Sequence, residues 1–320
     1  MTLTTKAPSA GPVRRGGGVR GVRPAAAPDR TPRPGSLYIL PAALFFAVFA
    51  VGPVIGVGVL SFMEWNGLGD PRFAGTANWE RFLGSGAIWD ATGRTLLLTG
   101  ACWVVQTPIS LAIGVWSAGR QRNRAVLSAV YFLPLLLSSA AIALGWKAIL
   151  DPNFGAAKAL GPLIGYSDGD LLGDTQGALL CIVMVVTWQF VPFHALLYQA
   201  AARNIPASIY DAALIDGAGR ATAFRYITLP QLRNTIITSS TLMIVGSLTY
   251  FETILLLTDG GPGGATHVLP FLMYTEGFRS YEMGFAATIA TALVVLGTSL
   301  SLLIVRFSGF AKMRSTLEGI

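Results

Sequence analysis

The chain has few charged residues, and long stretches carry none. Of its 320 residues only 12% are charged, whereas 52% are hydrophobic and the mean hydropathy is +0.57. This composition is too apolar for the surface of a water-soluble domain, so the surplus of apolar side chains must face lipid. The sequence therefore predicts an all-α membrane protein and argues against a soluble enzyme.

Cysteine, histidine and lysine are also scarce, and each scarcity excludes a class of site. Cys102 and Cys181 lie far apart in apolar stretches, which indicates buried apolar side chains and no disulfide framework. His194 and His267 are isolated, so we expect no metal site. A phosphate-cradling loop requires a Gly-Lys pair, but no lysine in the chain follows a glycine. We therefore predict no nucleotide site, no cofactor and no catalytic residue in this chain.

Six intervals with few charges are long enough to cross a bilayer. A bilayer core about 30 Å thick needs roughly 20 apolar residues of helix, because each residue advances the helix by about 1.5 Å. The sequence predicts about six transmembrane helices, at 37–62, 95–118, 125–149, 177–202, 235–257 and 284–306. Glu252 is the one acidic residue within these spans.

The basic residues divide unevenly between the two sets of loops, which predicts the orientation. Seventeen of the 23 Lys and Arg residues lie in the terminal segments and in the loops after the second and fourth spans. Because basic flanks stay on the cytoplasmic side during insertion, both termini are expected in the cytoplasm, with the chain in a bacterial-type plasma membrane. Topology and attraction to membrane lipid explain the net charge of +7, so no nucleic-acid partner is expected.

The sequence divides into a tail, a membrane domain and a second tail. Residues 1–36 are rich in Gly, Pro, Ala and Arg, and they bury too little apolar surface to offset the entropy of ordering. We expect a disordered basic cytoplasmic tail there, a transmembrane domain over 37–307, and a short cytoplasmic C-terminal tail over 308–320.

The loop 203–234 is long, and it contains helix signals. Pro206 suits the first turn of a helix, and Gly217 can adopt the left-handed conformation that ends one. A second short helix is expected from Arg220 to Tyr226, stopping before Leu229-Pro230. The loop is therefore predicted to form a helix-turn-helix elbow, called the elbow below, which is large enough to receive a partner protein.

Residues of the elbow resemble the cytoplasmic EAA loop of ABC importer permeases. The resemblance lies in Asp211-Ala212-Ala213, Asp216-Gly217-Ala218, Phe224, Ile227 and Leu229-Pro230. The family's leading position is usually Glu, and Asp211 keeps that carboxylate on a side chain one methylene shorter. The resemblance implies that the elbow docks onto a separate ATPase through Asp211, Ala212, Ala213, Asp216, Gly217 and Pro230.

A second block is similar to the carbohydrate branch of that family, in the subunit of the maltose system's F type. It comprises Phe251-Glu252, Leu257 to Pro262, Thr266, Tyr274 and Phe278. The resemblance implies a type I ABC importer fold and a subunit that forms half of the pathway for a sugar or oligosaccharide. It also implies a second permease subunit as heterodimer partner, two ABC ATPase subunits that use ATP and Mg, and an extracytoplasmic solute-binding protein.

Glu252 is a candidate for substrate contact, because an ionisable group within a span usually faces a cavity or a partner. Its carboxylate could accept hydrogen bonds from sugar hydroxyls, with Tyr250 or Trp188 offering a ring face to the sugar. It could equally pair with another helix. Other polar residues within the spans could line the pathway or join helices: Gln106, Gln189 and His194.

Other functions stay open at this point. An ABC permease for a non-sugar solute such as glycerol phosphate would share the elbow. An ion-coupled secondary transporter could use Glu252, but it would be expected to show a matching repeat, and the chain has one elbow. A membrane enzyme would need clustered His, Cys or acidic residues at one membrane depth, and the predicted spans contain only scattered ones. A transport subunit without catalytic activity is the expected function.

Overall fold

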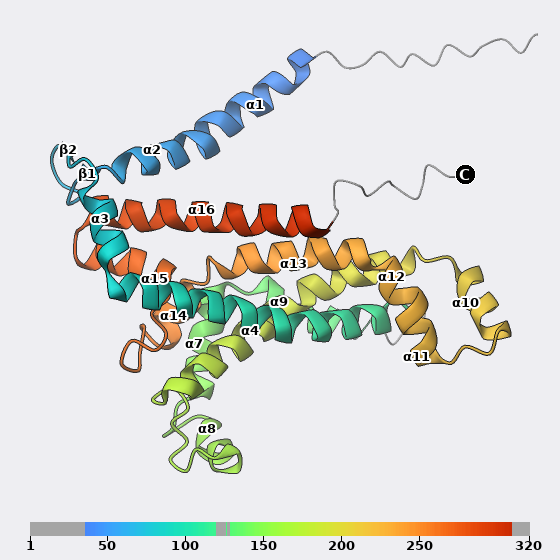
Figure 1. Ribbon diagram of the computed structural model, residues 1–320. Coiled ribbons are helices and arrows are strands. Elements are labelled where there is room, and N and C mark those ends of the chain that lie inside the picture. The colour runs from blue at the N-terminus through green and yellow to red at the C-terminus, as the bar shows by residue number, and fades with distance from the viewer. Residues whose placement is uncertain (1–35, 120–125, 127–128, 309–320) are drawn as a thin grey trace, which may run out of the picture.

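The computed structural model describes residues 36–119, 126 and 129–308, and this part of the chain is largely helical (Figure 1). Four helices are long and apolar enough to cross a membrane: Leu40–Leu60, α4 (Gly86–Ser117), α9 (Thr175–Arg203) and α16 (Met283–Ser308). They coincide with the first, second, fourth and sixth predicted spans. The predicted all-α membrane fold is confirmed. The tails 1–35 and 309–320 lie outside the described residues.

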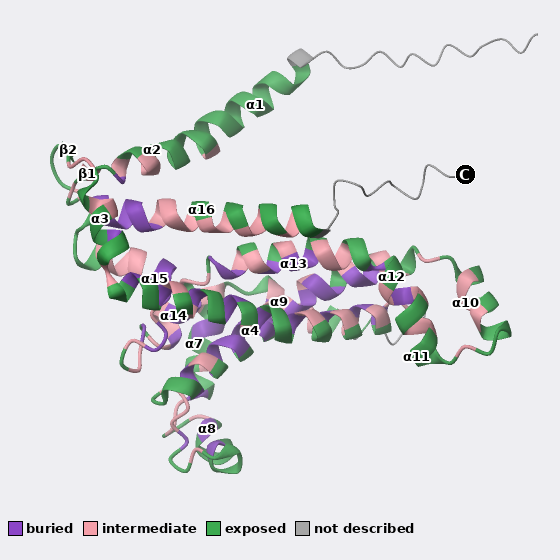
Figure 2. Cartoon of the chain, in the orientation of Figure 1, coloured by how far each residue is buried: buried purple, intermediate pink, exposed green. Residues whose placement is uncertain are grey.

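The first long helix contacts α16 near its C-terminal end and diverges from the other helices toward its N-terminal end (Figure 1). It consists of α1 (Leu40–Phe46), a π-helical turn η2 (Ala47–Val51) and α2 (Gly52–Leu60), and it follows a short 3-10 helix η1 (Ser36–Ile39). No side chain of α1, η2 or α2 is buried, and Figure 2 shows the exposed surface of this helix. Because so apolar a helix is unstable in water, lipid or another subunit must cover it.

α4 and α9 form the centre of the molecule and pack closely along their length. The face of α4 toward α9 carries the small buried residues Ser110, Gly114 and Ser117, which let the two backbones approach. Gln199 donates a hydrogen bond to the carbonyl oxygen of Ser117 at 2.9 Å, which joins the two helices where they end. Asp174 is the N-cap of α9, and its carboxylate accepts hydrogen bonds from the N–H groups of Gly177 and Gln176. These hydrogen bonds hold the pKa of Asp174 below its ordinary value.

α4 begins at Gly86, well before the predicted boundary at residue 95. The predicted boundary follows Arg94, because a charged residue is expected to end a span. The helix instead extends beyond Arg94 toward the N-terminus. A transmembrane helix can continue past the edge of the bilayer, because its backbone groups bond to each other whether or not lipid surrounds them.

The third and fifth predicted spans are divided into shorter helices. The third contains α6 (Leu133–Leu136) and α7 (Ser139–Ile149), and its residues 125, 127 and 128 lie outside the described part of the chain. Leu137 and Ser138 are extended, and the Ser138 hydroxyl accepts the N–H of Ala141 at 3.2 Å, which starts α7. The hydroxyl thus replaces a backbone acceptor where the helix is broken.

The fifth predicted span contains α13 (Arg233–Ser247) and α14 (Glu252–Leu257), separated by residues 248–251. In this break the N–H of Thr249 bonds to the carbonyl of Gly246, and the N–H of Phe251 bonds to that of Thr249 at 2.7 Å. These short-range bonds replace helical ones. At membrane depth such a break is stable only where the backbone is buried in protein or lines a cavity.

Small elements gather at the end of the bundle away from the elbow (Figure 1). They are the antiparallel strands β1 (Met63–Glu64) and β2 (Arg72–Phe73), α3 (Ala77–Gly84), α8 (Ala157–Leu160), η3 (Gly161–Ile164), α15 (Leu269–Tyr274) and the π-helical η5 (Thr275–Arg279). Arg81 of α3 pairs with Glu276 at 3.4 Å and Glu282 at 3.0 Å, and lies over the ring of Phe285. This contact fixes α3 against η5 and α16.

The α4–α9 contact predicts that alanine substitutions at two glycines of α4 differ in their effect on stability. A Cβ at Gly114 would lie 2.6 Å from the carbonyl oxygen of Ala195 and from Cβ of Tyr198, whereas a Cβ at Gly100 meets nothing within 4 Å. Gly114→Ala is therefore expected to destabilise the protein by about 1–3 kcal/mol, as overpacking does. Thermal unfolding in detergent measures this, with Gly100→Ala as the control. Equal melting temperatures for both variants would contradict the proposed close contact.

Candidate functional site

The first arm of the elbow is α10 (Ala207–Ile215), and it ends as the sequence predicts. Gly217 has a φ of +78°, in the left-handed region. The N–H of Ala218 bonds to the carbonyl of Ala213 at 2.8 Å, and the N–H of Gly217 bonds to that of Leu214 at 3.1 Å. This pair of bonds is a Schellman motif, which closes the helix and turns the chain sharply.

The outer face of α10 is uncovered. Asp211 and Ala212 are exposed, and the Asp211 carboxylate has no hydrogen bond or ion pair within the described residues. Leu214 is 73% exposed and Ile215 87% exposed, although both are apolar. Ala213 is half-buried on the inner side. A free carboxylate beside exposed aliphatic side chains is typical of a surface that binds another protein.

Asp216 and Gly217 lie at the turn between the two arms, and both are exposed. The second arm is one nearly continuous helical run. It comprises α11 (Arg220–Ala223), the π-helical η4 (Phe224–Thr228) and α12 (Leu229–Gln231), and it leads directly into α13. The expectation that the second helix stops before Pro230 was wrong. Pro230 lies in the first turn of α12, where its missing N–H is not needed, so the run continues through it.

The two arms are fastened to each other. The hydroxyls of Tyr210 and Thr228 are 2.8 Å apart and share a hydrogen bond. Leu232, just before α13, is fully buried. The hydrogen bond and the helical run therefore connect α10 to α13.

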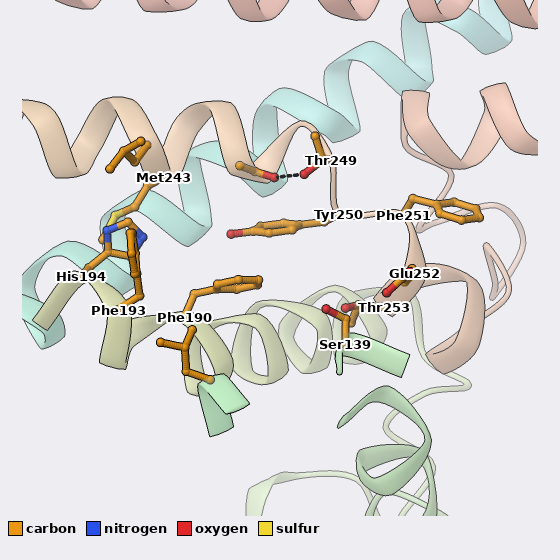
Figure 3. A pocket seen from close by; sticks show the side chains of 13 residues that line it. Ser139, Phe190, Phe193, His194, Met243, Thr249, Tyr250, Phe251, Glu252 and Thr253 are labelled. Atoms are coloured by element: carbon orange, nitrogen blue, oxygen red, sulfur yellow. Dashed lines mark hydrogen bonds between the residues drawn. The ribbon is translucent and has the colours of Figure 1, made fainter. Parts of the chain in front are cut away.

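α13 leads from the elbow to a cavity of about 500 Å³ at the break between α13 and α14. Figure 3 shows side chains of α9, α13 and the break converging on it. The break contributes Thr249, Tyr250 and Phe251, and α14 contributes Glu252 and Thr253. The cavity also satisfies the condition under which broken backbone is stable at membrane depth.

The wall combines aromatic rings with a few polar groups. Phe190 stacks on Tyr250, with ring centroids 5.5 Å apart and planes inclined by 22°. Glu252 is exposed toward the cavity and has no hydrogen bond or ion pair within the described part of the chain. His194 shares a hydrogen bond of 2.9 Å with Ser239. Among the described residues that line the cavity, none is Lys or Arg.

The four predicted pathway residues separate into two pairs. Tyr250 and Glu252 line the cavity, but Trp188 and Gln189 do not. Trp188 is 42% exposed and packs edge-on against Trp146, with centroids 5.7 Å apart. Gln189 is buried and donates to the Ser139 hydroxyl at 3.0 Å, so it joins α9 to α7 and orients a residue of the wall. Helical rotation explains the difference, since neighbours of Phe190 point to other faces of α9.

The sequence named His194 as a possible pathway residue, and it lines the wall, but sequence reasoning missed other wall residues. Phe190 and Phe193 lie at helical spacing with His194 on one face of α9, and Ser139 and Met243 also line the wall. The spacing of the two phenylalanines with His194 was the available signal, but an aromatic stripe in an apolar helix is equally typical of a lipid-facing surface. Gln106 is fully buried and does not line the cavity.

The described residues contain no group of three or more His, Cys, Asp or Glu that could hold a metal ion. Cys102 and Cys181 are buried, as predicted, and the structure has both as free cysteines.

Comparison with known proteins identifies this arrangement. The family model described as a binding-protein-dependent transport system inner membrane component matches residues 110–309. The chain belongs to this family of ABC importer permeases. The match covers the elbow and the cavity together, and the resemblance noted in the sequence is confirmed. This is a family of transport permeases, not of enzymes.

Named relatives of the permease transport carbohydrates. This chain is 32% identical to the trehalose/maltose transport system permease protein MalF of Thermococcus litoralis, over 82% of this chain and 90% of the relative. It is 29% identical to the diacetylchitobiose uptake system permease protein DasB of Streptomyces coelicolor, over 93% and 95%. A subunit of a bacterial alginate importer shares the fold, with a TM-score of 0.71 and 23% identity over 88% of the permease and 95% of that chain.

The loop after α14 explains one unusual residue of the permease. Asp259 has a φ of 49°, in the left-handed region that favours glycine. Its carboxylate accepts a hydrogen bond of 2.6 Å from Arg279. The ion pair ties this loop to η5, which offers a physical reason for an aspartate at a position that suits glycine.

Proposed function

We propose that this permease forms half of the translocation pathway for a sugar or oligosaccharide in an ATP-driven importer. The cavity at the α13–α14 break carries the proposal, because it combines a stacked aromatic pair with a free carboxylate. A volume of about 500 Å³ lies within the usual range of small-molecule sites. The carbohydrate names of the relatives support the same substrate class.

The chemistry of the wall favours a neutral polyhydroxyl solute. The carboxylate of Glu252 accepts hydrogen bonds from hydroxyl groups, and the Tyr250 ring offers an apolar face to the C–H surface of a sugar. A phosphorylated solute such as glycerol phosphate would call for guanidinium or ammonium groups, and the described lining residues contain neither. The alternative substrate is therefore the weaker candidate.

Energy enters through the elbow in this proposal. The outer face of α10, with Asp211 and Ala212, binds one of two separate ABC ATPase subunits, which use ATP and Mg. Gly217 sets the angle between the arms, and the run through Pro230 carries the displacement into α13. Asp216 lies exposed at the end of α10, where the chain turns. The permease itself contributes no catalytic residue.

The remaining partners follow from the surfaces and from charge. A second permease subunit pairs with this chain and, together with lipid, covers the apolar first helix. A solute-binding protein delivers the sugar from the outside. The excess of Arg on the elbow side supports a cytoplasmic location for that side and for both termini.

The cavity predicts which substitutions alter solute affinity. Tyr250→Ala and Glu252→Gln are each expected to raise the half-saturating sugar concentration about tenfold or more, since one pocket contact is worth about 1–3 kcal/mol. Uptake of labelled maltose and trehalose by cells that express the complete importer measures this. Trp188→Ala is the control, because Trp188 lies on the same stretch of α9 but outside the cavity. Loss of affinity in the control with none in the other two would remove this cavity from the pathway.

The elbow predicts a different defect. Asp211→Lys reverses the charge at the ATPase surface, and Gly217→Val places a β-branched residue at a φ of +78°. Both variants are expected to abolish uptake while the chain stays inserted in the membrane at normal abundance. Co-purification of the ATPase subunits is the second measurement, and it should fail for Asp211→Lys. Wild-type uptake by both variants would overturn the coupling proposal.

A further inference from the structure

A second cavity, of about 840 Å³, lies where the elbow meets the ends of the central helices. Residues from the ends of α4 and α9 form one side of this elbow cavity, and residues of α10, α11 and η4 form the other. It shares no lining residue with the sugar cavity. Its chemistry is different as well, because its charged groups are cationic.

Two arginines from different elements line the elbow cavity. Arg203 is the last residue of α9, and Arg220 is the first residue of α11. The guanidinium of Arg203 donates to the carbonyl oxygen of Ser117 at 3.4 Å, which holds it against the end of α4. Arg220 has no hydrogen bond or ion pair within the described residues.

No acidic residue is present among the described residues that line this cavity, so its two positive charges are not neutralised there. The hydroxyls of Tyr210 and Thr228 bond to each other at 2.8 Å, and they are therefore already partnered within the elbow. Recognition of a ligand is left to the two guanidinium groups. Guanidinium binds phosphate oxygens through paired N–H donors.

The remaining wall is apolar, and it lies at the depth where membrane helices end. Val115 and Ala118 at the end of α4 contribute to this wall, together with Ile205 and Phe224. A free phosphate ion would contact the arginines and gain nothing from these side chains. A phospholipid would use both parts, because its phosphate meets the arginines and its acyl chain meets the apolar wall.

We propose that the elbow cavity binds the phosphate group of an anionic phospholipid. Basic pockets between transmembrane helices on the cytoplasmic side are suited to such head groups. The bound lipid bridges the end of α9 and the start of α11, and so it stabilises the elbow in the position seen here. The inference goes beyond the proposed sugar transport, because it concerns a lipid-binding site in the elbow cavity and not the path of the solute.

The test compares lipid retention by variants of the complete importer. The complex is purified, mixed with phosphatidylglycerol or phosphatidylcholine, and weighed by native mass spectrometry. Wild type is expected to retain phosphatidylglycerol in preference to phosphatidylcholine. Arg220→Gln is expected to bind it about fivefold more weakly, because one arginine near a membrane surface contributes about that factor. Arg220→Lys, which keeps the charge but lacks the paired N–H donors, should restore part of the binding.

Arg225→Gln is the matched control. Arg225 lies in the same arm of the elbow, is exposed, and does not line the cavity. It should retain phosphatidylglycerol as wild type does. Equal retention by wild type and Arg220→Gln, or an equal loss in Arg225→Gln, would overturn the proposal. The intact mass of the complex in the same spectrum shows that each variant is folded and assembled.

The source of the phosphate is tested by competition. Inorganic phosphate added to the lipid-bound complex is expected to leave phosphatidylglycerol in place, because the ion cannot replace the contacts of the acyl chain. Displacement by inorganic phosphate would show that the cavity is a site for the free anion, and it would overturn the lipid assignment. Neither outcome depends on which solute the importer carries.

Discussion

Every backbone N–H and C=O at membrane depth must find a partner within the protein, and the arrangement of this permease depends on that requirement. The four long helices meet it largely by helical hydrogen bonds along their length. The chain between α13 and α14 meets it with the short-range bonds of Gly246, Thr249 and Phe251. Such a break is stable only beside protein or a cavity, and here a cavity lies next to it. Tyr250 and Glu252 are presented to that cavity because the chain leaves the helix at this point.

The break also explains how a distant surface can act on the cavity. α13 begins at the elbow and ends at the break, so a single helix connects the two. The hydrogen bond between Tyr210 and Thr228 fastens the arms, and the close α4–α9 contact at Gly114 gives them a fixed support. In the proposed mechanism, a shift of α10 alters the geometry of residues 248–251, where the wall is held by few helical bonds. Force would then enter at one end of α13, and the solute would be contacted at the other.

Much of this could be predicted from the sequence, and the limits have physical causes. Charge-free length located the four unbroken spans, because lipid excludes charge from them. The conformation of Gly217 followed from its place after a helix-forming run. The breaks in the third and fifth spans were not predicted, since Ser138 and Thr249 look like ordinary polar residues of a membrane helix. Trp188 was expected in the pathway, but helical rotation carries it to another face of α9 than Phe190. Which face of a uniformly apolar helix is covered depends on neighbours far away in the sequence.

The most direct measurement of the central claim is to purify the tagged chain from its native membrane in mild detergent, weigh its stoichiometric companions, and reconstitute the complex in liposomes. The account predicts a second six-span permease and a P-loop ATPase, with sugar uptake that requires ATP. A lone chain or a homodimer that accumulates solute in response to an ion gradient would contradict it.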